Sequence, residues 1–242
     1  MSPSAPTPVT PKVSIVIPIY NEEAILRAAV VNLRDGLLRQ NIAFEILLAE
    51  NGSRDGTVAI ASGLSADYPD VRWLSTAEPN YGAALRAGIR AARGELVICE
   101  EIDLCNVPFH VQALALLEGG ADLVIGSKLI GGARDQRPLT RHAASLIYTK
   151  ALQLLLGFPG TDTHGLKAFR RARLLPIVNA CVVDRDVFAS ELVIRAYRAG
   201  LDVREVPTSV AEMRPPSINL LRRLPNVAKN LAKLTWAIRG RG

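Results

Sequence analysis

Short apolar runs alternate with helical patterns along most of this 242-residue chain. The runs that predict strands cover residues 13–20, 44–49, 71–75, 96–99, 123–125, 166–169 and 203–207. The patterns that predict helices cover residues 22–38, 58–66, 83–92, 111–117, 145–156, 174–179 and 188–199. Strands and helices in such alternation form right-handed βαβ units around a mostly parallel sheet. The sequence therefore predicts a single Rossmann-like α/β/α sandwich.

The composition fits one such domain and excludes several other classes. The hydrophobic share is 49%, and a chain of this length buries a core without disulfide staples. The three cysteines lack the spacing of a disulfide framework or a zinc motif. No apolar stretch approaches the ~20 residues of a membrane span. We expect a disordered Pro-rich tail over residues 1–11, the main domain over 12–217 and a basic amphipathic helix over 218–242.

An acidic cluster follows the apolar run 96–99 directly and comprises Glu100, Glu101 and Asp103. Ligands of open α/β sheets bind at the carboxyl ends of the strands, where this cluster is expected. In extended backbone Glu101 and Asp103 point to the same side, as the ligands of a divalent cation would. Glu100 competes for that role, and a solvated acidic loop is the plain alternative.

Four motifs in the first half of the chain resemble those of family 2 glycosyltransferases in order and spacing. They are VSIVIPIYNEE at 13–23, ENGSRDGT at 50–57, NYGAALRAG at 80–88 and EIDL at 101–104. The family has D-D-G-S-x-D-G-T in place of the second and D-A-D-L in place of the fourth. The resemblance implies a GT-A fold, which is an α/β sandwich that binds a nucleotide sugar and a divalent metal ion. Glu101 departs from the family, which has Asp at that position.

The second half narrows the resemblance to the polyprenyl-phosphate (dolichyl-phosphate) mannose or glucose synthase branch. The segments that match are GSK at 126–128, DTHGLKAFRR at 162–171, FASEL at 188–192 and EVP at 205–207, with Arg214 and Ser217. This resemblance covers residues 12–217. It implies an inverting enzyme that moves a hexose from a GDP- or UDP-linked sugar to a polyprenyl phosphate.

The resemblance also assigns roles to individual residues. Asp103 and Glu101 are the implied ligands of Mg²⁺ or Mn²⁺ and take part in catalysis with Lys128 and Arg214. The residues implied to bind the donor nucleotide are Pro18, Tyr20, Asn21, Glu22, Glu50, Asn51 and Gly82. The residues expected at the acceptor or its phosphate are Arg134, Asp162, His164 and Ser217.

The two classes of acceptor differ in whether the reaction needs a general base. A phosphate monoester is already ionised and needs mainly positioning, and the basic residues favour it. A hydroxyl acceptor on a sugar or small metabolite needs a base, for which Asp162 or His164 is a candidate. A third reading is a catalytically silent protein that binds nucleotide sugars, and the change at Glu101 favours it.

The C-terminal segment combines apolar and basic residues over 218–238, and no Asp or Glu follows Met213. The whole chain has a net charge of +6. Such a helix either binds the surface of an anionic membrane or packs on its own domain, and the sequence leaves both open. Nucleic acid is not expected as a partner because an aromatic platform for bases is missing. We expect a cytoplasmic enzyme at the cytoplasmic face of the membrane, with an oligomeric state that the sequence leaves open.

Overall fold

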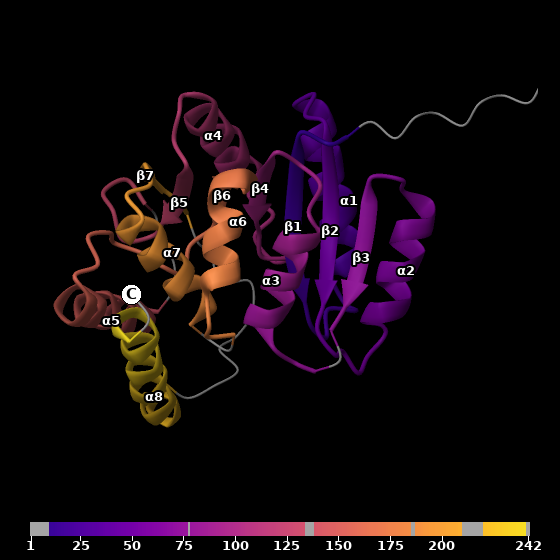
Figure 1. The fold of residues 1–242 in the computed structure, drawn as a ribbon. Helices are drawn as coiled ribbons and strands as arrows, with labels where there is room; N and C mark the ends of the chain where they lie inside the picture. Colours follow the sequence, from indigo (N-terminus) through magenta and orange to yellow (C-terminus); the bar gives the residue numbers. More distant parts are fainter. Residues whose placement is uncertain (1–9, 77, 134–137, 185–186, 210–219, 241–242) are drawn as a thin grey trace, which may run out of the picture.

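Seven strands and eight helices alternate along the part of the chain that the structure describes (Figure 1). In this computed structural model the described residues are 10–76, 78–133, 138–184, 187–209 and 220–240, with only the backbone described over 220–228. The strands are β1 (Val13–Ile19), β2 (Phe44–Glu50), β3 (Val71–Ser75), β4 (Leu96–Cys99), β5 (Leu123–Ser127), β6 (Lys167–Arg170) and β7 (Val203–Pro207). The helices are α1 (Leu26–Arg39), α2 (Thr57–Asp67), α3 (Tyr81–Ala91), α4 (Val107–Glu118), α5 (Leu139–Leu156), α6 (Arg171–Ala180), α7 (Phe188–Arg198) and α8 (Leu220–Arg239).

One sheet joins all seven strands in the order β3-β2-β1-β4-β6-β5-β7. The pairs β1–β2, β2–β3, β1–β4 and β5–β7 are parallel, while β6 is antiparallel to both β4 and β5. The prediction of a mostly parallel sheet is confirmed. The strand order reverses direction between β1 and β4, and open α/β sheets bind their ligands at such a point.

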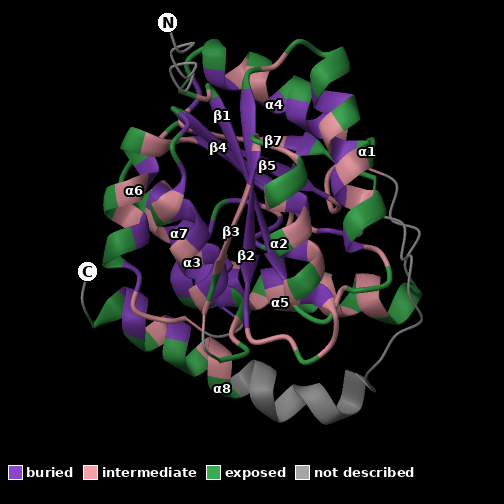
Figure 2. Cartoon of the chain, turned by 90° about the vertical axis from the view of Figure 1, so that its right-hand side faces the viewer, coloured by how far each residue is buried: buried purple, intermediate pink, exposed green. Residues whose placement is uncertain are grey.

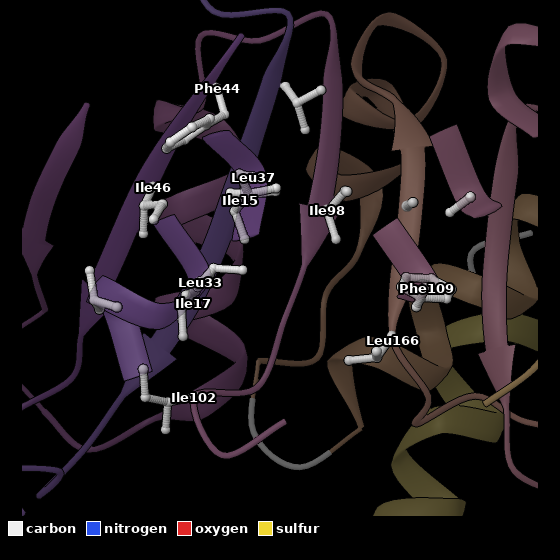
Figure 3. Close-up of a cluster of buried hydrophobic side chains, with 14 of the residues drawn as sticks. Ile15, Ile17, Leu33, Leu37, Phe44, Ile46, Ile98, Ile102, Phe109 and Leu166 are labelled. Atoms are coloured by element: carbon white, nitrogen blue, oxygen red, sulfur yellow. The ribbon is translucent and has the colours of Figure 1, made fainter. Parts of the chain in front are cut away.

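The sheet lies between two layers of helices, as the alternating pattern predicts. Ile15 and Ile17 of β1 belong to a core that packs against α1, α2 and α4, and Figure 3 shows part of it. Val16 belongs to the opposite core, which packs against α3, α5, α6, α7 and α8. In Figure 2 the central strands are buried while the outer surfaces of the helices are exposed. Successive strand residues alternate between faces, so β1 contributes to both cores.

Several element boundaries differ from the sequence predictions, including the start of α5 at Leu139 rather than at residue 145, and two of the differences are explained by hydrogen bonds. Helix α1 begins at Leu26, not at Glu22 and Glu23, because those residues bond the turn after β2. The Glu22 backbone N–H donates to Thr57 Oγ1 (2.7 Å), and the Glu23 carboxylate accepts from the Gly56 N–H (2.7 Å). Helix α4 begins earlier than predicted, at Val107, because the side chain of Asn106 caps it.

The described half of α8 packs on the domain. Leu234, Ala237 and Ile238 are buried, and the Arg195 side chain donates to the Ala237 carbonyl oxygen (2.9 Å). None of the described helices combines the length and the apolarity that crossing a membrane requires. For Leu234, Ala237 and Ile238, the structure therefore agrees with the alternative that the C-terminal helix packs on its own domain.

Candidate active site

The carboxyl ends of β1, β2, β4 and β5 lie at the same edge of the sheet, which is the lower edge in Figure 1. The predicted site residues of the described chain lie in the loops that follow these strands, or in segments next to those loops. Since β6 runs antiparallel, its first residue, Lys167, also lies at this edge, opposite Cys99 at the end of β4. The topology therefore brings acidic residues from one half of the chain next to basic residues from the other.

The acidic segment after β4 is a turn rather than a continuation of the strand. The N–H groups of Leu104 (3.0 Å) and Cys105 (3.3 Å) both donate to the Glu101 carbonyl oxygen. Cys105 has φ of 41°, in the left-handed region. The expectation that Glu101 and Asp103 project from extended backbone is therefore wrong. Both residues stay half-buried, and the charge of Asp103 acts on the Glu101 carboxylate.

Glu100 is used inside the protein, where it contacts His110. Its side chain and that of His110 are both 0% exposed, and His110 Nε2 lies 2.6 Å from Glu100 Oε2. The same carboxylate accepts from the backbone N–H groups of Glu101 (2.9 Å) and Asn106 (2.9 Å). Glu100 thus ties both ends of the acidic turn to helix α4. His110, for which the sequence indicates no partner, is the other member of this buried pair.

The surroundings of Glu101 disfavour the negative charge of its carboxylate. Burial, together with the nearby charges of Asp103 and Glu100, raises its pKa to about 7. The Tyr81 hydroxyl donates to Glu101 Oε1 (2.5 Å) and favours the charged form. Tyr81 is the middle residue of the motif Asn80-Tyr81-Gly82, and the sequence analysis assigns it no role in the site. Its place at the start of α3 is the sequence feature that could have indicated one.

We expect Glu101→Gln to stabilise the metal-free protein at pH 8. A folded-state pKa above the unfolded value adds stability at low pH, and this is lost as pH rises from about 4.5 to about 7. The glutamine keeps the hydrogen bond from Tyr81 and removes the charge. The expected gain at pH 8 is about 1–3 kcal/mol, shrinking towards pH 5. Urea unfolding in EDTA at both pH values measures it, with exposed Glu78→Gln as the control, and an equal effect at both pH values would contradict it.

The basic side of the site is a buried cluster of three charged groups. Lys128 Nζ donates to Asp162 Oδ2 (2.6 Å), and both side chains are largely buried. Lys167 is also buried, donates to the Gly165 carbonyl oxygen (2.7 Å) and interacts electrostatically with Asp162 and Glu101. Burial lowers the pKa of Lys167 despite those acids. Lys167 was missed as a site residue, although it stands at the basic position of the quoted segment 162–171.

Asp162 is held as a carboxylate by this cluster. Burial works against its charge, but Lys128 and the N–H of His164 (2.8 Å) outweigh burial and lower its pKa. His164 is exposed and its ring meets the ring of Tyr148 edge-on at 5.3 Å between centroids. The two candidates for a general base therefore lie side by side, next to Lys128.

The predicted donor residues Asn21, Glu50 and Asn51 join the loops at the rim of the sheet. Asn51 donates to the Ile19 carbonyl oxygen (3.1 Å) and accepts from the Asn80 N–H (3.0 Å). Asn21, with φ of 54°, accepts from the Arg54 N–H (2.9 Å). These bonds link the exits of β1 and β2 to the start of α3.

Glu50 and Pro18 are the most enclosed of the predicted donor residues. Glu50 is 1% exposed and accepts from the Ser53 N–H and the Ser75 hydroxyl. Burial opposes its charge, but these hydrogen bonds outweigh it and lower the pKa. Pro18 is buried within β1, while Tyr20 just beyond it is exposed at the rim and Glu22 is half-buried.

Close packing requires glycine at position 82, and the sequence alone does not reveal this. A Cβ added there would lie 1.6 Å from the Asp184 carbonyl oxygen and 2.8 Å from Phe188 Cβ.

We expect Gly82→Ala to lower the free energy of unfolding by about 1–3 kcal/mol, because backbone must move to admit the methyl group. Gly131→Ala, whose Cβ meets nothing within 4 Å, is the matched control in urea unfolding. Unchanged stability with weakened nucleotide binding would instead support a direct donor role.

Arg134, Arg214 and Ser217 lie outside the described residues, so their predicted roles stay predictions. The described residues that the fold brings together are Glu101, Asp103, Tyr81, Lys128, Asp162 and Lys167. They join an acidic turn to a basic cluster at the switch point of the sheet.

Comparison with known proteins identifies the family. The model for glycosyl transferase family 2 matches residues 14–175. The dolichol-phosphate mannosyltransferase of Mycosarcoma maydis is 33% identical over 83% of this chain and 70% of its own length. The polyprenol monophosphomannose synthase of Mycolicibacterium smegmatis is 31% identical over 96% of this chain and 89% of its own. The resemblance to the polyprenyl-phosphate branch is confirmed.

Longer relatives and solved structures agree on the fold. Glycosyltransferase AglD of Haloferax volcanii is 28% identical over 98% of this chain, which spans only 39% of AglD. Glucosyl-3-phosphoglycerate synthase of Mycobacterium tuberculosis, solved with UDP, superposes with a TM-score of 0.69 at 22% identity, over 96% of this chain and 81% of its own. The same enzyme has been solved with Mn²⁺, UDP-glucose and phosphoglyceric acid. The GT-A fold is thereby confirmed, and this chain is a glycosyltransferase that belongs to glycosyl transferase family 2.

Proposed function

We propose that this enzyme transfers a hexose from a GDP- or UDP-linked sugar to a polyprenyl phosphate, with inversion at the anomeric carbon. The observation that carries the proposal is the pairing of the acidic turn with the basic cluster of Lys128 and Lys167. Carboxylates suit a cation that holds the donor diphosphate, and ammonium groups suit a second anion. The relatives named as polyprenyl-phosphate mannose synthases supply the acceptor class.

The described residues fit a divalent metal ion held jointly with substrate. Among them, no three His, Cys, Asp or Glu side chains form a group that could hold a metal ion alone. The pair Glu101 and Asp103 suits Mg²⁺ or Mn²⁺, which commonly takes one or two carboxylates plus phosphate oxygens. Burial and the neighbouring charges of Asp103 and Glu100 raise the pKa of Glu101, and a cation bound beside it would favour its carboxylate form. A metal ion bound there supplies Lewis-acid stabilisation of the leaving diphosphate.

The protein's own residues position the two substrates. Donor contacts are assigned to Pro18, Tyr20, Asn21, Glu22, Glu50 and Asn51 at the rim, with Gly82 behind them. An oxygen of the acceptor phosphate attacks the anomeric carbon, and the bond from that carbon to the nucleoside diphosphate breaks. Lys128 is assigned to hold the acceptor phosphate, with Arg134, Arg214 and Ser217 as further contacts. The attacking oxygen is already ionised, so no proton has to be removed.

The state of Asp162 favours a phosphate over a hydroxyl acceptor. A general base works best with a pKa near the operating pH, whereas Lys128 and His164 lower the pKa of Asp162. Asp162 instead orients the Lys128 ammonium group. A hydroxyl acceptor therefore remains the second candidate, with His164 as the general base that it would need.

The domain limits and the location belong to the same proposal. Residues 12–217 make up the GT-A domain, and 218–242 form the basic C-terminal segment that contacts the membrane. The expected place of action is the cytoplasmic membrane face, where a lipid phosphate and a water-soluble nucleotide sugar meet.

The test is a donor and acceptor panel on the full chain. Thermal shift with Mn²⁺ and GDP- or UDP-sugars identifies the donor, because a bound ligand raises the melting temperature with the logarithm of its concentration. Radiolabelled transfer is then measured to a short polyprenyl phosphate, a prenyl alcohol, a free sugar and phosphoglycerate. Transfer to the prenyl phosphate alone supports the proposal. Transfer only to a hydroxyl acceptor, or donor binding without any transfer, overturns it.

A further inference from the structure

Glu205, the acid of the EVP motif at 205–207, has no part in the transfer described so far. It lies in β7, the edge strand next to β5 (Figure 1), in register with Ile125. Glu205 is half-buried, and its carboxylate accepts two hydrogen bonds from Thr161. The Thr161 N–H donates to Oε1 (2.8 Å), and the Thr161 hydroxyl donates to Oε2. Both carboxylate oxygens are therefore directed at one loop residue rather than at solvent.

The Thr161 hydroxyl extends this contact to the residue that precedes Lys128. Ser127 Oγ lies 2.7 Å from Thr161 Oγ1. A hydroxyl has a single hydrogen, and Thr161 gives its own to Glu205, so Ser127 is the donor between the two. Ser127 Oγ in turn accepts from the Leu129 N–H (3.1 Å). A chain of hydrogen bonds thus runs in one direction from Leu129 to Glu205, and the carboxylate sets that direction because it only accepts.

This chain of hydrogen bonds flanks the buried ion pair of the basic cluster. Ser127 directly precedes Lys128, and Thr161 directly precedes Asp162. Lys128 Nζ donates to Asp162 Oδ2 (2.6 Å). Consecutive Cα atoms are about 3.8 Å apart, so a movement of Ser127 relative to Thr161 is passed directly to the ion pair. The contact between Ser127 and Thr161 therefore helps to determine where the Lys128 ammonium group lies.

Helix α5 holds the same loop from another side. Thr149 donates to the Thr161 carbonyl oxygen (3.0 Å), and the Gln153 side chain donates to the Gly160 carbonyl oxygen (3.1 Å). Both contacts use carbonyl groups, whereas Glu205 takes the N–H and the hydroxyl of Thr161. A Cβ at Gly160 would lie 2.6 Å from Glu205 Oε1, so glycine there lets the carboxylate approach. A change at Glu205 therefore leaves the loop attached to α5 and removes only the direction of the chain of hydrogen bonds.

We propose that Glu205 is a positioning residue: through the chain of hydrogen bonds it fixes the Lys128–Asp162 pair where the acceptor phosphate binds. The role of the pair toward an acceptor rests on the proposed function, whereas the positioning concerns only contacts within this chain. A hydrogen bond from an ammonium group to a phosphate is about 2.7–2.9 Å long, and misplacement by about 1 Å costs up to about 10²-fold in rate. The Lys128 side chain is only 9% exposed, so it has little room to restore such a contact by turning.

The first test is the reactivity of Lys128 in Glu205→Gln, with no substrate present. Glutamine has the size of glutamate, but its amide group donates as well as accepts, so the direction of the chain is no longer set. The rate at which N-acetoxysuccinimide acetylates Lys128 is followed in the full chain by mass spectrometry of its peptides. We expect this rate to rise about fivefold, because the loss of a hydrogen bond to a charged group favours open forms of the pair. Exposed Lys150 of α5 is the internal reference and should react as in the wild type.

A matched acid at the opposite edge of the sheet separates positioning from general destabilisation. Glu45 likewise accepts from a hydroxyl and an N–H, which belong to Ser14 (2.6 Å) and Arg93 (2.7 Å). Glu45→Gln should lower the free energy of unfolding in urea at least as much as Glu205→Gln does. It should leave the acetylation of Lys128 unchanged, because no contact of Glu45 leads to the ion pair.

Variants of Thr161 test the chain of hydrogen bonds itself. Thr161→Val removes the hydroxyl at nearly constant shape and should reproduce the faster acetylation of Lys128. Thr161→Ser keeps the hydroxyl and should react as the wild type. The double variant Glu205→Gln/Thr161→Val should react no faster than either single variant, because both changes interrupt the same chain.

The outcomes distinguish this inference from the proposed function. Acetylation of Lys128 requires neither donor nor acceptor, so it is decided even if no transfer is found. Where transfer to the prenyl phosphate occurs, KM for that acceptor should rise about tenfold in Glu205→Gln, with KM for the nucleotide sugar unchanged. Unchanged acetylation in Glu205→Gln overturns the inference, as does an equal rise in Glu45→Gln. Should Glu205→Gln not fold, Thr161→Val decides by the same criterion.

Discussion

Asp103→Ala is expected to lower kcat/KM for sugar transfer by about 10²–10³-fold with little change in stability. Removing one preorganised group that stabilises charge in a transition state commonly costs this much. Asp103 is half-buried in the turn after β4, and among the described residues its side chain makes no hydrogen bond that the substitution would remove. Its loss also relieves the repulsion that raises the pKa of Glu101.

Calorimetry of nucleoside diphosphate binding, with and without Mn²⁺, separates the cause from a general loss of activity. In Asp103→Ala the gain in affinity that Mn²⁺ confers should disappear, while metal-free binding persists. Asp35→Ala, an exposed acid on α1, is the matched control and should behave as the wild type. A metal effect that survives in Asp103→Ala would remove Asp103 from the metal site.

Glu100→Ala is expected to destabilise the protein by about 3–5 kcal/mol, because each buried polar group that loses its hydrogen-bond partner costs about 1–3 kcal/mol. His110 then loses its partner at 0% exposure, and two backbone N–H groups of the acidic turn lose their acceptor. Unfilled side-chain volume adds to the cost. Urea unfolding at pH 7 measures the effect directly.

A double-mutant cycle attributes that cost to the pair. Glu100→Leu and His110→Leu should each be strongly destabilising, and the double variant should cost less than their sum by at least about 1 kcal/mol. The double variant should still fall short of the wild type, because leucine accepts no hydrogen bond from Glu101 or Asn106. Strict additivity would show that the two side chains do not act as a unit.

Much of the fold could be predicted because its signals are local. Strands β1, β2, β4 and β5 are largely apolar runs that the sequence predicts directly, whereas β3, β6 and β7 mix apolar and charged residues. The direction of β6 could not be predicted, since four residues carry no signal for parallel or antiparallel pairing. The start of α1 was misplaced because Glu22 and Glu23 resemble helix-start acids, whereas their bonds go to the turn at 55–57.

Motif order places Glu101, Asp103, Lys128 and Asp162 in the predicted site, and the fold brings them together, but their roles stay predictions. Nothing local in the sequence says that Lys128 and Asp162 form an ion pair. The burial of Glu100 with His110 contradicts the usual exposure of acids, so an acidic run could not reveal it. Lys167 reaches the site only because β6 runs against its neighbours.

The place of β6 in the sheet also governs the order in which the molecule can be assembled during synthesis. Strands β1 to β4 find all their mutual neighbours within the first 99 residues, so that half can form as soon as it leaves the ribosome. Strand β5 pairs only with β6 and β7, which are made much later. Its apolar run must wait unpaired, and nascent chains with unpaired strands are prone to aggregate. The acidic turn is therefore made early, and its basic counterpart joins it only after β6 has been synthesised.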